Sequence, residues 1–535
     1  MLDVHRREAV AMNRKTRFMI ALALLAGVLG YRAMQRQAPE TDDKSGKGPP
    51  KPVVAEPAPE RNLGRIAFRP CSLSPPMGAA SVEAQCGTLS VPENPAQPAG
   101  RKIALNIAWL PADEAGDHLP DPVFLIAGGP GQSATESFAG IVPALADVRK
   151  DRDLLLVDQR GTGKSNPLQC KFDDGEEGVD PTDSGDDAQE TPEALRDAAI
   201  RCRDQLARKA DLRFYTTTDG VRDLDAVRAA IGAEQVNLMG VSYGTRVAQQ
   251  YAMRYPQRTR TIVLDGVAPN AIYLGNDFAR NLESALDLQF GRCAKTPGCT
   301  KSLGDPRKRL DALMAKLRVE SPLVRYRDAS TGQMLEERLR PGHVAGLARM
   351  YAYAPIVSSI LPLLLHEAEQ GRYEGLMALS KMLGNSLSDQ MMYGMQMSVV
   401  CAEDASGLLA DEAMSASILG NSLVDVMQAQ CAAWPKGDAP KDFHAPLATK
   451  VPALLLSGEL DPVTPPAYAD MVAKSLPNAR SLVLRGQGHN VIAVGCTPKL
   501  FAQFLATANA KTLDVKCLDS LAYVPPFTTF NGWEP

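Results

Sequence analysis

A serine inside a Gly-x-Ser-x-Gly motif is the first group in this sequence that could do chemistry. The motif spans residues 240–244 (GVSYG), follows the apolar run 236–239 and precedes a helical pattern over 245–255. Glycines on both sides of a serine let a strand and a helix approach closely, so that a strained turn projects the hydroxyl into a cleft. This context predicts that Ser242 is a catalytic nucleophile.

A serine hydroxyl needs a base within hydrogen-bond reach and a carboxylate that orients the base. Of the six histidines, His489 alone follows a strand pattern, at 482–484, from which a loop could carry it to the edge of a sheet. Asp461 follows the apolar run 453–456 and is expected to face His489, with Glu459 as the rival acid. The resulting order along the chain, serine then acid then histidine, is that of α/β-hydrolases.

Attack by a serine creates a negatively charged oxygen that backbone N–H groups must stabilise. One donor is expected from Tyr243, the residue after the nucleophile. The other is expected from Gly129, in the loop 127–131 (AGGPG) that follows the apolar run 123–126. These groups suffice for hydrolysis through an acyl-enzyme, so neither a metal nor a cofactor is expected.

The elements that must position these residues follow from the hydrophobic pattern. Short continuous apolar runs, separated by helical intervals, are typical of strands buried on both faces of a parallel sheet. Alternating apolar and polar residues over 86–110 predict antiparallel strands at the start of the same sheet. The fold class is therefore α/β. The apolar runs are 123–126, 154–157, 236–239, 262–264, 453–456 and 482–484.

Five parts are expected along the chain. Basic residues precede the apolar run 18–31, which is typical of an export signal and, at 14 residues, short for a membrane span. Both a cleaved signal and an uncleaved anchor remain open. Helical patterns alone between 265 and 451 predict a cap inserted into the sheet domain. The parts are 1–37 (export signal or membrane anchor), 38–62 (Pro-rich linker), 63–269 (first part of the core), 270–446 (helical cap) and 447–535 (last part of the core).

Composition and cysteine usage limit the remaining possibilities. The 535 residues are 45% hydrophobic and 22% charged, as in a globular protein, and the net charge of −4 does not favour binding of nucleic acid. Ten cysteines without metal-ligand spacing fit disulfides in an oxidising compartment, so export to the periplasm or the exterior is expected. Neighbours along the chain are expected to pair: Cys71 with Cys86, Cys170 with Cys202, Cys293 with Cys299, Cys401 with Cys431, and Cys496 with Cys517.

Three further segments invite a binding interpretation. Residues 161–165 end like a phosphate-binding loop, but the first glycine that such a loop needs is replaced by Asp158. The segment 173–190 holds nine acidic residues whose spacing matches no calcium loop, so a solvated loop is expected. The Met-rich segment 391–397 is expected to fill core, with an adaptable apolar pocket as the alternative.

Several of these motifs together resemble one family. The AGGPG loop, the segment 158–165 (DQRGTGKS) and the serine motif closely resemble the prolyl aminopeptidase and tripeptidyl aminopeptidase family of α/β-hydrolases, over about residues 71–517. The CGTLSVPE segment that begins at Cys86, and the segment around Cys496, look more like the exported tripeptidyl type. One departure is Ala127, where prolyl aminopeptidases usually carry histidine.

The resemblance implies a serine aminopeptidase that acts near the free N-terminus of short peptides. Such an enzyme must bind an ammonium group, and the resemblance favours an acid near residues 401–404, with Glu403 as the expected ligand. A carboxylesterase acting on small esters through the same triad is the alternative. A catalytically silent binding protein is disfavoured, because all three triad candidates are present. A monomer is expected, with short peptides as partners and with the N-terminal anchor still open.

Overall fold

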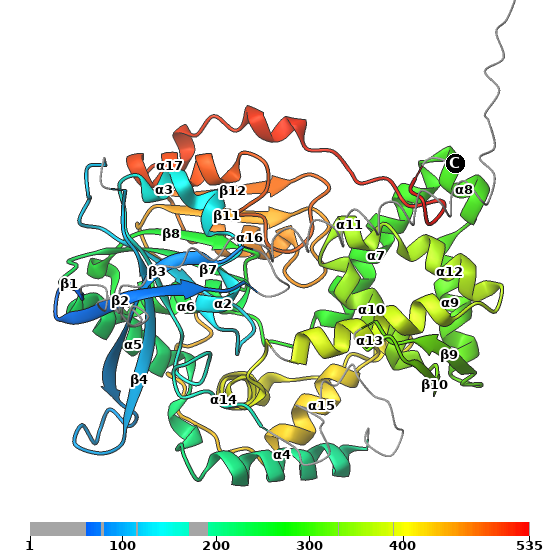
Figure 1. Ribbon diagram of the computed structural model, residues 1–535, viewed down its shortest axis with the longest axis horizontal. Helices are drawn as coiled ribbons and strands as arrows, with labels where there is room; N and C mark the ends of the chain where they lie inside the picture. The colour runs from blue at the N-terminus through cyan, green and yellow to red at the C-terminus, as the bar shows by residue number, and fades with distance from the viewer. Residues whose placement is uncertain are drawn as a thin grey trace, which may run out of the picture. The chain divides into compact units, whose positions relative to one another are not determined.

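Ten strands of the described residues form one sheet, in the order β1-β2-β3-β4-β6-β5-β7-β8-β11-β12 (Figure 1). Strands β1 to β4 pair antiparallel, β4 pairs antiparallel with β6, and the strands from β6 to β12 are parallel. This confirms the expected α/β class and the antiparallel start of the sheet. The strands are β1 Arg61–Leu63, β2 Ile66–Leu73, β3 Val82–Pro92, β4 Lys102–Leu110, β5 Val123–Ile126, β6 Leu154–Val157, β7 Val236–Val241, β8 Thr259–Asp265, β11 Ala453–Gly458 and β12 Ala479–Leu484.

The structure is a computed structural model, and it describes residues 60–75, 80–113, 116–170, 191–329, 331–388 and 390–533. These residues belong to a unit that begins at Ala58. The expected export signal, most of the expected linker and the acidic segment 173–190 lie outside the described residues. The last two residues of that linker, Arg61 and Asn62, are part of strand β1. Among the described helices, none has the length and apolar character needed to cross a membrane.

Helices cover both faces of the sheet, which explains why the central strands are apolar throughout. All residues of β5 and β6 are buried. Phe124 packs in the core on one face of the sheet and its neighbour Leu125 in the core on the other. The first face is covered by α5 Thr217–Ala230, α6 Tyr243–Arg254 and α16 Pro466–Ala473, and the second by α3 Ala146–Arg149 and α17 Thr497–Thr507.

The chain between β8 and β11 is mainly helical and has a hydrophobic core of its own. The helices of this region, called the cap below, are α7 Phe278–Ala294, α8 Pro297–Leu303, α9 Pro306–Leu317, α10 Pro341–Ala352, α11 Pro355–Ser358, α12 Leu361–Glu369, α13 Glu374–Ser388, α14 Tyr393–Glu403 and α15 Ser422–Cys431. Two further helices outside it are α2 Ala134–Ser137 and α4 Pro192–Leu206.

The cap also contains a two-stranded antiparallel hairpin, β9 Leu323–Arg327 with β10 Met334–Arg338. The expectation that this region has only helices was therefore wrong. Both strands are five residues long; charged residues alternate with the others in β9, and β10 ends in three consecutive charged residues. Only Val324 and Tyr326 are buried, so the hairpin has no continuous apolar run that would have revealed it.

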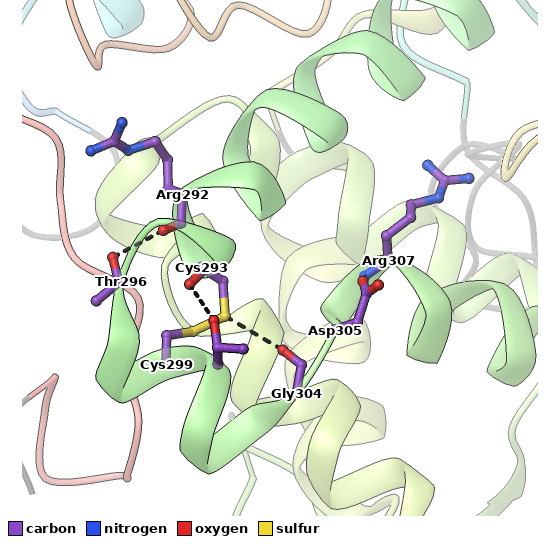
Figure 2. Close-up of a disulfide and its surroundings, with 8 residues drawn as sticks. Arg292, Cys293, Thr296, Cys299, Gly304, Asp305 and Arg307 are labelled. Carbon is purple, nitrogen blue, oxygen red and sulfur yellow. Dashed lines mark hydrogen bonds between the residues drawn. A yellow bond between two sulfur atoms is a disulfide. The ribbon is translucent and has the colours of Figure 1, made fainter.

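Five disulfides join the cysteine pairs that neighbour each other along the chain. They are Cys71–Cys86, Cys170–Cys202, Cys293–Cys299, Cys401–Cys431 and Cys496–Cys517. Figure 2 shows the Cys293–Cys299 bond, which links the end of α7 to α8. In the turn between these helices, the Thr296 hydroxyl donates a hydrogen bond to the Arg292 carbonyl (2.9 Å, Figure 2). Several disulfides in one chain suggest an exported protein.

Candidate active site

Ser242 lies in the tight turn between β7 and α6, at the edge of the sheet where the parallel strands end. Its backbone has φ 56° and ψ −125°, a strained conformation for any residue other than glycine. A Cβ atom on Gly240 would lie 2.3 Å from the carbonyl oxygen of Gly244, and one on Gly244 would lie 2.2 Å from that of Ile126. The close packing of α6 on β7 and β5 therefore requires both glycines of the motif.

His489 and Asp461 meet at the same edge of the sheet. His489 Nδ1 lies 2.7 Å from Asp461 Oδ2, and the two side chains are 3% and 0% exposed. The backbone N–H groups of Val463 and Thr464 donate to Asp461 Oδ1 at 2.9 and 2.8 Å, and the Thr464 hydroxyl donates to Oδ2 at 2.9 Å. Because these bonds fix the carboxylate, they favour a proton on His489 Nδ1 and leave Nε2 free to accept one.

Burial and charge act in opposite directions on His489. Burial disfavours the protonated ring, but the negative charge and the hydrogen bond of Asp461 outweigh burial and raise the pKa of His489 above its ordinary value. A raised pKa makes the imidazole a stronger proton acceptor, which suits a general base.

One strand end brings the nucleophile and the histidine together. The Ser242 N–H donates to the carbonyl oxygen of Asp265, the last residue of β8, at 2.8 Å. The next residue, Gly266, lies against the histidine ring, because a Cβ atom there would be 2.9 Å from His489 Cε1. Ser242 and His489 are thus both in contact with residues 265–266.

The AGGPG loop lies beside the nucleophile. A Cβ atom on Gly128 would be 3.0 Å from Ser242 Cβ, whereas one on Gly129 would meet the backbone of the following residues and Met391 Sδ. Gly128 is therefore the glycine of this loop that packs on Ser242, which the sequence pattern alone did not single out. Tyr243 is the first residue of α6, where backbone N–H groups have no acceptor within the helix.

The cap contacts the loop that contains His489 and the AGGPG loop. The carbonyl oxygen of Tyr353, after α10, accepts the His489 N–H at 2.9 Å, and its ring packs edge to face on the imidazole with centroids 5.1 Å apart. On the other side, the Met392 N–H donates to the Gly131 carbonyl at 3.1 Å. Sequence reasoning missed Tyr353, because its contact is made by a backbone carbonyl and nothing in its helical pattern marks it.

Glu403 does not have the surroundings expected of an ammonium ligand. Its side chain is buried, and its two oxygens accept hydrogen bonds from the Thr217 N–H at 2.6 Å and the Thr217 hydroxyl at 2.7 Å. Burial, with the neighbouring charge of Asp404, raises the pKa of Glu403 to about 8. The neutral form is favoured at neutral pH, and Glu403 forms a contact between the cap and α5; its role as the ammonium ligand stays a prediction.

The rival acid Glu459 is also engaged away from the histidine. Its carboxylate accepts hydrogen bonds from the Gly486 N–H at 2.8 Å and the Tyr523 hydroxyl at 2.9 Å. Of the two carboxylates, Asp461 is the one that contacts His489. Among the described residues, no group of three or more His, Cys, Asp or Glu side chains could hold a metal ion.

Two family models each match one segment of this chain, and one known protein matches most of its length. A family model described as the alpha/beta hydrolase fold matches residues 121–302, and one described as TAP-like protein matches residues 416–517. The serine protease Hip1 of Mycobacterium tuberculosis is 26% identical over 506 residues, covering 86% of this chain and 92% of Hip1. A tripeptidyl aminopeptidase of Streptomyces lividans is 30% identical over 196 residues, covering 34% of this chain and 35% of the relative.

Two further similarities concern an esterase and a solved structure. Carboxylesterase B of Mycobacterium tuberculosis is 29% identical over 293 residues, covering 52% of this chain and 54% of the relative. The crystal structure of a proline iminopeptidase from Mycobacterium smegmatis is 17% identical, with a TM-score of 0.39, and covers 78% of this chain and 98% of that one.

The sheet, the serine turn and the matched segments define a serine hydrolase of the α/β-hydrolase fold, and more specifically one of the peptidase type. The chain is also similar to the tripeptidyl aminopeptidases, because its second matched segment fits a family model described as TAP-like protein and one of its relatives carries that name.

Proposed function

We propose that this protein is a serine aminopeptidase that cleaves peptide bonds near the free N-terminus of short peptides. In this proposal Ser242 is the nucleophile, His489 the general base and Asp461 the acid that orients the imidazole. The observation that carries it is the buried 2.7 Å contact between His489 Nδ1 and Asp461 Oδ2, on the sheet edge that also holds the strained Ser242.

The steps follow from these groups. Ser242 Oγ attacks the carbonyl carbon of the scissile bond while His489 Nε2 takes the hydroxyl proton. The protonated imidazole, stabilised by Asp461, then donates that proton to the leaving amine, which leaves an acyl-enzyme. A water molecule, activated by His489, hydrolyses the acyl-enzyme and releases the N-terminal fragment. The N–H groups of Tyr243 and Gly129 are the proposed donors to the negatively charged oxygen. Each such donor typically contributes about 3 to 4 kcal/mol of transition-state stabilisation.

A free N-terminus requires an acid near the scissile bond, and Glu136 is better suited to this role than Glu403. Glu136 lies in the short helix α2, five residues after Gly131 of the AGGPG loop. Its side chain is half-buried, and among the described residues its carboxylate forms no hydrogen bond or ion pair, although the charge of Lys164 acts to lower its pKa. Burial, followed by the charge of Asp158, raises the pKa of Glu136, so an ammonium group beside it would relieve an unfavourable charge.

A carboxylesterase is the second candidate function, because one relative carries that name and the triad serves ester hydrolysis equally well. An esterase of this fold would need no acid for an ammonium group. The two candidate functions differ in whether the substrate needs a free amino group. A comparison of substrates with and without that group therefore separates them.

The decisive experiment compares alanyl, prolyl and tripeptidyl anilides with their N-acetylated forms and with a short-chain ester. An aminopeptidase cleaves the free-amino anilides and not the acetylated ones. Ser242→Ala should lower kcat by at least about 10⁴-fold. Equal cleavage of acetylated anilides, or activity on the ester alone, would move the protein to the esterases. Full activity of the Ser242 variant would reject the proposed nucleophile.

We also propose that the protein works in the periplasm or outside the cell as a monomer, with its N-terminal segment serving as a signal or an anchor. The five disulfides support an oxidising compartment. Cell fractionation, followed by mass determination of the mature chain, tests the location and the cleavage together.

A further inference from the structure

Asp265 is a second buried carboxylate beside the proposed triad. It is the last residue of β8 and pairs in register with Val241, next to the nucleophile. Its side chain is 0% exposed. Among the described residues no lysine or arginine forms an ion pair with it, so hydrogen bonds are the main compensation for the loss of water around its charge.

These hydrogen bonds come from the loop that carries the histidine. The Val491 N–H donates to both carboxylate oxygens of Asp265, at 2.9 and 2.8 Å, and the Ile492 N–H donates to Oδ2 at 2.8 Å. Both donors follow His489 closely, after Asn490, whose φ of 68° makes the chain turn. The carboxylate therefore holds the backbone of this loop two and three residues beyond the histidine.

The main chain of the same residue holds the nucleophile. The Asp265 carbonyl oxygen accepts the Ser242 N–H at 2.8 Å, and this bond supports a strained serine backbone. The positions of serine and histidine thus depend on two groups of one residue, which lies at the end of β8, an interior strand of the sheet. Reacting groups on loops are positioned best when such rigid elements support them.

The charge of Asp265 also acts on the histidine. Burial raises the pKa of Asp265 to about 6, and the two backbone donors, together with His489, oppose that rise while Asp461 adds to it. In return, the Asp265 charge contributes to the raised pKa of His489, after burial and Asp461. Asp265, Asp461 and His489 therefore form one electrostatically coupled cluster.

We propose that Asp265 is a positioning residue of the active site, whose ionised carboxylate fixes the histidine loop and favours the protonated imidazole during catalysis. This proposal rests on the proposed function, since it assigns Ser242 and His489 their catalytic roles. Asp265 itself touches neither substrate nor the reacting atoms.

Asp265→Asn is the variant that tests it. The amide keeps the size of the side chain but loses its charge, and its NH₂ group faces backbone donors that need an acceptor. We expect kcat to fall by about 100-fold, because the histidine is misplaced, while KM changes little. The acidic limb of kcat/KM should move to lower pH, because removing a negative charge lowers the pKa of His489.

Asp153→Asn is the matched control. Asp153 is also a carboxylate that accepts a backbone N–H, from Ala112 at 2.8 Å, but it precedes β6, at the opposite end of the parallel strands. Its variant should keep the wild-type pH profile. Loss of activity in Asp265→Asn without movement of the acidic limb would reduce Asp265 to a structural residue and overturn the proposal.

Two further measurements keep the outcomes separate. Turnover by Ser242→Ala would reject the proposed function, whereas an inactive Ser242→Ala with a normal Asp265→Asn would reject the positioning role alone. If Asp265→Asn does not fold, hydrogen exchange of the wild-type enzyme is decisive. After correction for intrinsic rates, peptides covering 489–495 should lose protection at pH 5 relative to pH 7.5, while those covering β11 should not. Equal protection at both pH values would overturn the proposal.

Discussion

Arg246 and Asp404 form an ion pair in which neither side chain is exposed. Arg246 Nη1 lies 3.0 Å from both oxygens of the Asp404 carboxylate, and Nη2 donates to the carbonyl oxygens of Pro269 and Ile272. Arg246 is in α6, one turn after Ser242, and Asp404 follows the cap helix α14. The pair therefore joins the helix of the candidate nucleophile to the cap.

Replacing Asp404 by asparagine should destabilise the protein strongly. The change leaves the buried Arg246 charge without its partner, which typically costs about 3 to 5 kcal/mol. Urea denaturation measures the loss of unfolding free energy. Asp442→Asn is the control, because Asp442 pairs with Arg254 of the same helix α6 but is 54% exposed, and it should cost less than about 1 kcal/mol. Equal losses in both variants would contradict this account of the buried pair.

The pH dependence of activity should reflect the raised pKa of His489. The base must be neutral to accept the serine proton, so kcat/KM rises with pH through that pKa. Because Asp461 raises it, the acidic limb should lie above the ordinary histidine value of about 6.5. A kcat/KM profile with an alanyl anilide from pH 5 to 9 measures the limb, with stability checked at each pH. A midpoint at or below the ordinary value would show that burial dominates.

Glu136 and Glu403 are expected to respond differently to removal of their charge. Glu136→Gln should raise KM for free-amino substrates by roughly 10- to 100-fold, the worth of a hydrogen bond between charged groups. Glu403→Gln should leave that KM unchanged and lower the melting temperature, because it perturbs the contact with Thr217. The reverse pattern would restore Glu403 as the ammonium ligand. If the KM values of both variants equalled that of the wild type, neither acid would be the ammonium ligand.

Loss of the Cys401–Cys431 disulfide should lower stability by an amount that its loop length predicts. The bond closes a loop with a sequence separation of 30 residues between α14 and α15, which corresponds to roughly 3 to 4 kcal/mol in the chain-entropy estimate. The double alanine variant, compared by urea denaturation, measures this loss.

The Cys293–Cys299 bond provides the control for that experiment. Its loop has a separation of only six residues (Figure 2), so its double alanine variant should lose less, roughly 2 kcal/mol. A larger loss from the short loop would show that local packing around the sulfurs, and not chain entropy, determines the stabilisation.

The sequence predicted those parts of the molecule whose signals are local. The serine turn, Asp461 and His489 each lie in the turn or loop that follows a strand, so the strand pattern also indicates the edge of the sheet at which they meet. The α/β class was confirmed for the same reason. The catalytic roles of these residues stay predictions until activity is measured.

What the sequence could not predict depends on contacts between distant segments. Glu403 was chosen for its place along the chain, but its partner Thr217 is 186 residues away. Tyr353 and Asp265 contact the histidine loop through a carbonyl oxygen and through backbone donors, and neither kind of contact leaves a pattern in residue types. The hairpin β9–β10 escaped detection because its strands are short and largely exposed.

The sheet order has a consequence for how the enzyme is assembled. Strand β8 ends at Asp265, and its parallel neighbour β11 begins only at Ala453, after the whole cap. During synthesis the turn that contains Ser242 is therefore made long before the chain supplies β11 and β12, which Asp461 and His489 follow. Contacts over such sequence distances slow folding, and any polypeptide that stops inside the cap contains a serine with no partner. The proposed triad is thus complete only when the segment after the cap has folded against β8, which precedes the cap.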